Sequence, residues 1–176
     1  NPNNKCGFNP LQLPDNSQNR TFLLDWLKHL VTVNGEKLGA EDISLLNKAI
    51  NGYYKLDFHD RTLRNIAPFL GLEGPATLAG RLAMWHSDGS HASVFDNPID
   101  SIDLNENSVF GFEMGELLRD SISLGPVLLY LFHRINISLD GTPTMIVLDE
   151  AWALIDNPIF APKIKDWLKV LRKLNT

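Results

Sequence analysis

The fold class of this chain is decided by one stretch, Thr144-Met145-Ile146-Val147-Leu148-Asp149-Glu150, in which a β-branched apolar run stops on two acids. A run of this kind, without polar alternation, is typical of a strand that is covered on both faces. A second apolar run, Val109-Phe110-Gly111-Phe112, precedes it, and between them the sequence predicts a helix that is apolar nearly all round, with Pro126 in its first turn. Strand, buried helix and strand in this order form a βαβ unit. The sequence therefore predicts an α/β fold for residues 106–176.

The chain before this unit has a helical periodicity. Apolar residues recur at helical spacing in four segments between about residues 18 and 87, and no strand pattern interrupts them. The first 17 residues contain three prolines among Asn and Gln, which predicts an extended segment. We therefore expect three parts: an extended segment at 1–17, an all-helical part at 18–105 and the α/β part at 106–176, so that the chain as a whole is predominantly helical.

The composition excludes several classes of protein. Of 176 residues, 44% are hydrophobic and 21% are charged, which excludes intrinsic disorder. The single cysteine excludes an internal disulfide framework. A net charge of -5 argues against a general nucleic-acid binder, because phosphate contacts need clustered Lys and Arg. The last predicted helix, which starts between Pro158 and Pro162, has a basic outer face that is typical of a solvated helix.

The two acids at the end of the apolar run are the sharpest chemical feature. Ligands of open α/β sheets bind beyond the carboxyl ends of the strands. There Asp149 can hold Mg²⁺, directly or through water, as a Walker B Asp does, and Glu150 can orient or deprotonate an attacking water. The alternative is an ordinary solvated strand end, where acids are frequent. On the pattern alone, both interpretations stay open.

A nucleotide hydrolase also needs a phosphate cradle, and the sequence shows none. The P-loop requires glycines for close backbone approach and a Lys for the β and γ phosphates. None of the 12 glycines is followed by Lys. Other sites have weaker support: His86, Asp88 and His91 indicate a polar surface turn rather than a metal site, and His133 indicates a core residue.

The segment Ile146-Val147-Leu148-Asp149-Glu150-Ala151-Trp152 resembles the Walker B segment of the type IV secretion system ATPases of the CagE/TrbE/VirB family. Other stretches agree with the family in order, and together they cover nearly the whole chain. They are Gly7-Phe8-Asn9-Pro10-Leu11, Asn19-Arg20, Phe22-Leu23, Trp26-Leu27, Gly80-Arg81-Leu82, Trp85-His86, Phe95-Asp96-Asn97-Pro98, Leu131-Phe132-His133-Arg134, Asp166-Trp167-Leu168-Lys169 and Leu171-Arg172-Lys173.

This resemblance implies a partial RecA-like P-loop NTPase domain interrupted by a large all-helical subdomain. It implies that the Walker A loop lies upstream of Asn1 and that a strand with a phosphate-sensing Gln lies downstream of Thr176. Asp149 then carries over as the Mg²⁺ ligand and Glu150 as the catalytic carboxylate that acts on ATP. Arg172 is our candidate for a basic residue that reaches a phosphate across a subunit boundary.

From the resemblance we expect a segment of an ATPase that energises assembly of a bacterial type IV secretion system or substrate transfer through it. The parent would be a homo-hexamer bound to other secretion components at the cytoplasmic face of the inner membrane. The segment alone would be inactive, and whether the cargo is DNA or protein stays open. The alternative is a non-catalytic interaction module whose helical part docks on channel components.

Overall fold

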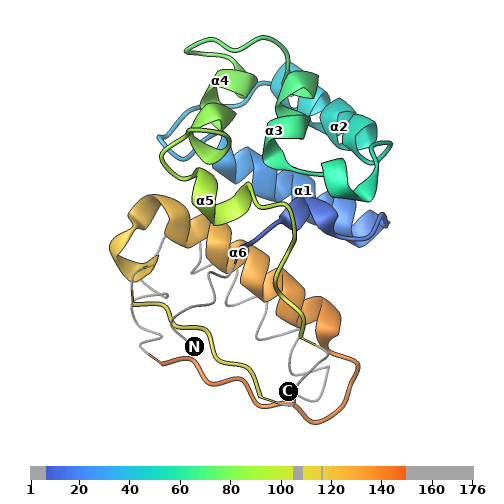
Figure 1. Cartoon of the computed structure of the whole chain (residues 1–176), viewed down its shortest axis with the longest axis vertical. Helices are drawn as coiled ribbons and strands as arrows, with labels where there is room; N and C mark the ends of the chain where they lie inside the picture. Colours follow the sequence, from blue (N-terminus) through green and yellow to red (C-terminus); the bar gives the residue numbers. More distant parts are fainter. Residues whose placement is uncertain (1–6, 105–108, 116, 150–176) are drawn as a thin grey trace. The chain divides into compact units, whose positions relative to one another are not determined.

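The computed structural model describes residues 7–104, 109–115 and 117–149. The chain divides into two compact units, Asn1–Ile102 (unit 1) and Asp103–Thr176 (unit 2). Unit 1 consists of helices and loops, drawn from blue to green in Figure 1. Unit 2 contains one long helix and two extended stretches, drawn from yellow to red (Figure 1).

Helices α1 (Ser17–Leu30) and α2 (Ala40–Tyr53) pack against each other in unit 1. Asn16 caps α1, since its Oδ1 accepts a hydrogen bond from the Asn19 backbone N–H at 2.8 Å. The carboxylate of Asp42 accepts a bond from the Gly39 N–H at 2.9 Å and so fixes the start of α2. The predicted helical periodicity is confirmed here, because the buried side chains recur at helical spacing. They are Leu23, Trp26, Leu27, Leu30, Leu46, Ala49, Ile50 and Tyr53.

The rest of unit 1 is built from short helices. Helix α3 (Leu63–Ile66) continues as the 3₁₀ helix η3 (Ala67–Leu70), and α4 (Leu78–Leu82) continues as η4 (Ala83–Trp85). Pro68 explains the change from α-helix in α3 to 3₁₀ helix in η3, because proline has no N–H to continue the α-helical hydrogen bonds. Three more pieces are shorter still: η1 (Pro10–Gln12), η2 (Phe58–Asp60) and α5 (Ala92–Phe95).

Three aromatic side chains hold these short helices on α1. The Phe95 ring lies 5.0 Å from the Trp26 ring, edge to face, and 5.7 Å from the Trp85 ring, measured between centroids. The buried Trp85 Nε1–H donates a hydrogen bond to the Leu30 carbonyl at 3.1 Å, so its polar atom is satisfied. The sequence prediction that Trp26 and Trp85 are core residues is therefore confirmed.

Unit 2 is organised around α6 (Ser121–Ser138), which follows the short helix η5 (Leu117–Arg119). Every residue from Ser123 to Leu131 is buried, as expected for a helix that is apolar nearly all round. The helix begins earlier than we predicted: Asp120 caps it by accepting bonds from the N–H groups of Ile122 and Ser123. Pro126 therefore lies in the second turn, not in the first.

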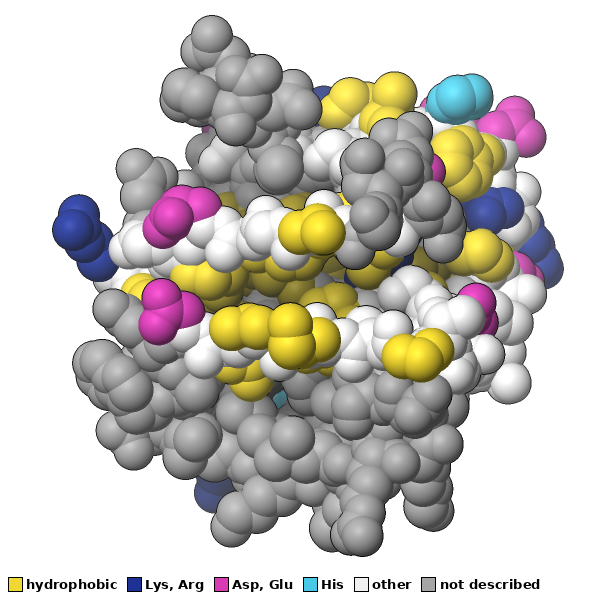
Figure 2. Space-filling view, turned by 90° about the horizontal axis from the view of Figure 1, so that it is seen from below, with side chains coloured by type: hydrophobic (Ala, Val, Ile, Leu, Met, Phe, Trp, Pro, Cys, Tyr) yellow, Lys and Arg dark blue, Asp and Glu magenta, His cyan; other side chains and the backbone are white. Residues whose placement is uncertain are grey.

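The two predicted strands are extended, but neither forms a hydrogen-bonded ladder within the described residues. In Figure 1 the stretches at 109–115 and 139–149 run alongside each other in the same direction, and Figure 2 shows the same two neighbouring rows from below. The chain path therefore matches a βαβ unit. The predicted RecA-like α/β sheet is not confirmed, because a parallel pair also needs backbone bonds between its strands.

Within the described ranges, no helix combines the length and the apolar character needed to cross a membrane.

Candidate functional site

Asp149 is the one predicted catalytic-site residue in the part of the chain that the structure describes. It is exposed, and it lies in a turn directly after the extended stretch 143–148. This is the place that the sequence predicted for it. Glu150 and Arg172 lie outside the described residues.

A turn fixes the start of the extended stretch. One carboxylate oxygen of Asp140 accepts hydrogen bonds from the Thr142 backbone N–H at 3.0 Å and from the Thr142 hydroxyl at 2.7 Å. These bonds lower the pKa of Asp140, since they favour its charged form. Gly141 has a φ of 92°, a conformation that glycine adopts without a Cβ penalty. The stretch that leads to Asp149 therefore begins at a defined turn.

Burial alternates along the stretch. Met145 and Val147 are 86% and 76% exposed, whereas Ile146 and Leu148 are half-buried. This period of two is that of an extended chain with one side against the unit and the other side open. Asp149 has the same parity as the two exposed residues and is itself exposed.

The donor at this site suits magnesium. Mg²⁺ prefers oxygen ligands and is commonly held by one or two carboxylates, with water and substrate phosphates completing its shell. In the described part of the chain no three His, Cys, Asp or Glu side chains gather closely enough to hold a metal by themselves. Asp149 therefore offers one oxygen donor of the kind that Mg²⁺ accepts, and the described residues do not gather into a closed metal site.

His133 is half-buried. It lies on α6, where burial and the neighbouring Arg134 charge lower its pKa to about 4. Arg134 Nη1 donates to the Tyr130 hydroxyl at 3.0 Å. The imidazole is therefore neutral at pH 7, and it lies just beyond the fully buried part of α6, which ends at Leu131.

Asp88 and His91 lie in the turn that the sequence predicted, whereas His86 is only 6% exposed and is therefore buried rather than on the surface. His86 Nδ1 lies 3.1 Å from the Ser87 hydroxyl, and His91 Nδ1 lies 2.8 Å from the Ser90 hydroxyl. The His91 ring also lies 5.3 Å from the Trp85 ring, between centroids. Each histidine thus has its hydrogen-bond contact with the neighbouring serine.

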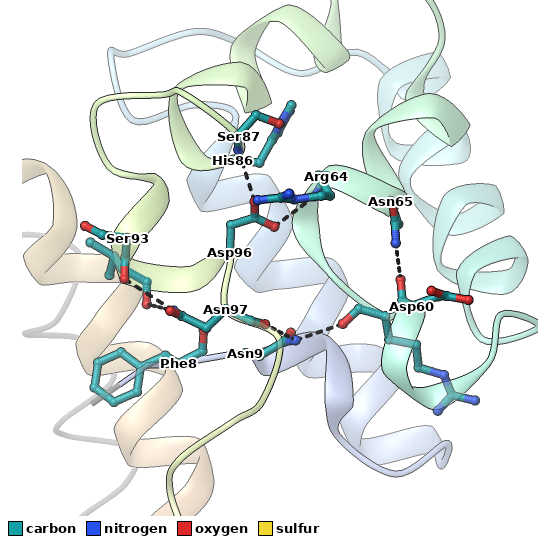
Figure 3. A network of polar contacts seen from close by, with 12 residues as sticks. Phe8, Asn9, Asp60, Arg64, Asn65, His86, Ser87, Ser93, Asp96 and Asn97 are labelled. Carbon is teal, nitrogen blue, oxygen red and sulfur yellow. Dashed lines mark hydrogen bonds and ion pairs between the residues drawn. The ribbon is translucent and has the colours of Figure 1, made fainter. Parts of the chain in front are cut away.

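Sequence reasoning missed a polar cluster in unit 1. It joins the segments 7–13 and 96–102, which we call the neck because the first leads into the helices and the second leads out of them. Asn9 is fully buried, and its Nδ2 donates to the Arg61 carbonyl at 2.9 Å and to the Asn97 carbonyl at 2.7 Å (Figure 3). The side-chain amide of Asn97 in turn donates to the Phe8 carbonyl at 3.0 Å.

A second pair of contacts closes the neck. Gln12 Nε2 donates to the Pro98 carbonyl at 2.8 Å, and Gln12 Oε1 accepts from the Asp100 backbone N–H at 2.9 Å. The backbone N–H of Ser101 donates to the Gly7 carbonyl at 3.0 Å. The chain therefore leaves unit 1 beside the point where it came in.

Asp96 extends this cluster toward the short helices. It accepts bonds from Arg64 Nε and Nη2 at 2.9 and 2.8 Å and from the Ser87 backbone N–H at 3.0 Å (Figure 3). Ser87 has a φ of 55°, which is uncommon for a residue with a Cβ, and the bond to Asp96 holds it there. Two of the stretches that resemble the secretion ATPase family, Gly7 to Leu11 and Phe95 to Pro98, contain residues of this cluster. The sequence alone assigned them no role.

The chain is similar in sequence to proteins of known type. No protein-family model matches the chain. The chain is 33% identical over 171 residues to the type IV secretion system protein VirB4 of Bartonella quintana (strain Toulouse). It is 33% identical over 169 residues to the conjugal transfer protein TrbE of Rhizobium radiobacter, and 32% identical over 180 residues to the type IV secretion system protein PtlC of Bordetella pertussis (strain Tohama I).

These matches cover 96% of this chain. The chain spans only about a fifth of each relative, 22% of VirB4, 20% of TrbE and 22% of PtlC. The similarity therefore concerns one segment of a longer type of protein.

Proposed function

Because this chain belongs, as one segment, to the family of type IV secretion and conjugal transfer proteins that includes VirB4, TrbE and PtlC, we propose that it is part of an ATPase that powers such a system. ATP hydrolysis by the longer protein would energise assembly of the secretion system or substrate transfer through it. The observation that carries the proposal is a match over 96% of the chain that includes an acid directly after an apolar extended stretch.

Asp149 is the proposed Walker B acid. Its carboxylate would hold Mg²⁺, directly or through water, and the ion would offset the phosphate charge of ATP. The half-buried residues Ile146 and Leu148 support this role, because they hold the end of the stretch where Asp149 lies against the unit. A defined position matters, since catalysis by an acid depends on its geometry.

Glu150 is the proposed catalytic carboxylate, which would orient or deprotonate the attacking water. Arg172 is the proposed phosphate contact across a subunit boundary of a homo-hexamer. The phosphate cradle would come from the longer protein, because no glycine of this chain is followed by Lys. We therefore propose that the 176 residues alone do not hydrolyse ATP.

The remaining assignments follow the family. Residues 1–17 and 106–176 would belong to a RecA-like core, and residues 18–105 would form the all-helical subdomain inserted into it. The longer protein would act at the cytoplasmic face of the inner membrane, in contact with other secretion components.

A non-catalytic interaction module is the second candidate. In this alternative the helical part would dock on channel components without catalysis of its own.

The test uses the full-length protein that contains this segment, with ATP hydrolysis and nucleotide binding measured separately. Replacing Glu150 by Gln should lower turnover about 100-fold or more and leave ATP binding nearly unchanged, as expected for loss of a general base. Asp149→Asn should lower turnover and also raise the Mg²⁺ concentration needed for half-maximal activity. Glu73→Gln, in an exposed loop, is the matched control. Normal turnover in Glu150→Gln would contradict the catalytic role, and a full-length protein without ATPase activity would favour the interaction module.

A further inference from the structure

Two Asn-Gly pairs occur in the chain, at residues 34–35 and 51–52. Asparagine is a thermolabile residue, and in an Asn-Gly pair its side-chain amide carbon lies next to a backbone nitrogen that no Cβ shields. The first group is an electrophile and the second is a nucleophile, so the pair can react when the backbone brings them together. The structure holds the backbone of the two pairs in different ways.

The pair at 34–35 lies in the turn that follows α1. Asn34 and Gly35 are both exposed, and a Cβ at Gly35 would meet no atom of the described chain within 4 Å beyond its neighbours in sequence. One hydrogen bond engages the nucleophile, from the Gly35 N–H to the Thr32 carbonyl at 2.9 Å. The Asn34 side-chain amide has a contact of 3.4 Å to the Glu36 carboxylate. Opening of this single turn therefore frees both reacting groups.

The pair at 51–52 lies inside α2. Asn51 is exposed as well, so exposure does not separate the two pairs. The backbone separates them, because α2 continues to Tyr53 and its peptide units are held in the helical hydrogen bonds. The Phe69 ring also packs on Gly52, where a Cβ would lie 2.5 Å from a ring carbon. Asn51 Oδ1 accepts a hydrogen bond from Arg20 Nη1, so this pair reacts only when the end of α2 melts.

We propose that Asn34 is a site of spontaneous covalent modification, at which water converts its side-chain amide into a carboxylate. Base removes the proton of the Gly35 N–H, and this nitrogen attacks Asn34 Cγ. A C–N bond forms, the Cγ–Nδ2 bond breaks, and the amide nitrogen takes up a proton and leaves as ammonia, so that a succinimide ring remains. One water molecule then opens the ring at either carbonyl, and the product is aspartate or isoaspartate.

The product changes the turn after α1. In the unmodified chain the Glu36 carboxylate accepts hydrogen bonds from the backbone N–H of Asn34 at 3.1 Å and from its side-chain amide at 3.4 Å. A carboxylate at residue 34 removes the side-chain donor and places a second negative charge beside Glu36. Isoaspartate also adds a methylene group to the backbone. The modification therefore loosens this turn, and it is independent of the proposed ATP hydrolysis.

Ageing the full-length protein at mildly alkaline pH tests the proposal. Trypsin cleaves after lysine, so it releases residues 29–37 and 49–55 as separate peptides, each with one Asn-Gly pair. Mass spectrometry detects the conversion as a gain of about one dalton in the peptide concerned. We expect residue 34 to convert at least about tenfold faster than residue 51, because it needs only the opening of one turn.

Protein unfolded in urea is the control for the structural argument. Once the turn and the helix are lost, the two pairs should convert at rates within about threefold of each other. Asn34→Gln should remove the conversion from the peptide 29–37, because the longer side chain closes the corresponding ring much more slowly. Asn51→Gln is the matched variant and should leave the rate at residue 34 unchanged.

Two results would overturn the proposal. A rate at residue 51 that equals or exceeds the rate at residue 34 in the folded protein would show that α2 does not protect its pair. Conversion of residue 34 in urea alone would show that the bond from Gly35 to Thr32 protects the turn as fully as the helix protects the other pair.

Discussion

At the scale of the residue, the side-chain amide of Asn9 joins three segments of unit 1. Its Nδ2 donates to carbonyls of Arg61 and Asn97, and its Oδ1 accepts from the Leu11 N–H at 3.2 Å. Asn9→Ala would leave two part-buried carbonyls and the buried Leu11 N–H without this partner, so we expect a loss of about 2–3 kcal/mol in the free energy of unfolding. Urea denaturation measures it as a lower midpoint at unchanged slope.

Asn47 provides the control for Asn9. It is exposed on α2, and its amide bonds only to the Ile43 carbonyl one turn earlier. Asn47→Ala should change the free energy of unfolding by less than about 0.5 kcal/mol. Equal losses in the two variants would show that burial of Asn9 at the neck does not increase the free energy of unfolding.

His133 predicts a pH dependence of stability. Its pKa is about 4 in the folded chain, below the value of 6.5 for an ordinary histidine. A histidine with a lowered folded pKa contributes full stability above about pH 6.5, and this contribution is lost as the pH falls toward 4. We expect a loss of about 2–3 kcal/mol over that window from this residue.

The His133 effect is isolated by comparison with variants. His133→Gln should flatten this part of the profile of unfolding free energy against pH, whereas His59→Gln, in the exposed 3₁₀ helix η2, should not. An NMR titration of the His133 ring in the unmodified chain gives the pKa without a substitution. A measured value near 6.5 would contradict the burial argument.

At the scale of the element, α4 depends on a glycine. A Cβ at Gly80 would lie 1.9 Å from the Gly74 carbonyl oxygen, so the loop before α4 would have to move. Gly80→Ala should therefore lower the free energy of unfolding by about 1–3 kcal/mol, although alanine is the better helix former. At Gly39, where a Cβ would find only a side-chain atom at 3.8 Å, the same substitution should cost less than about 1 kcal/mol. Thermal denaturation of the two variants checks the difference, and a stabilised Gly80→Ala would contradict it.

The helical segments with apolar residues recurring over two or more turns were predictable. The spacing of apolar residues predicts α1, α2 and α6, and it also predicts the segments that the structure divides into α3 with η3 and α4 with η4. The pieces η1, η2 and α5 were not predicted, because three or four residues are too short for a periodicity to appear. The end of the stretch at Asp149 was predictable from the apolar run. The neck was not, because Asn9 bonds to a carbonyl 88 residues away and no local pattern encodes such a pair.

At the scale of the whole molecule, the two units differ in what their residues provide. Unit 1 has its own aromatic core and closes its two ends on each other through the neck. Unit 2 carries Asp149 and the long helix α6. The division separates the helical part from the stretch that ends at Asp149, but it groups the described residues 7–17 with the helices, whereas the proposed function assigns 1–17 to the core.

The closure of unit 1 predicts that residues 7–102 fold alone. The Ser101 N–H bonds to the Gly7 carbonyl, and Gln12 pairs with Asp100, so the two ends of the excised chain are tied by contacts within it. A shorter chain, 14–95, keeps the aromatic core but lacks both segments of the neck. It should unfold without cooperativity, because the Arg61 carbonyl loses its hydrogen bond from the buried Asn9 side chain. Circular dichroism during heating distinguishes the two, and hydrogen exchange should show α1 and α2 of the 7–102 chain as protected as in the 176-residue chain. If both excised chains melted with the same sharp transition, the neck would not be needed for cooperative folding. If neither did, unit 1 would depend on contacts from the rest of the protein.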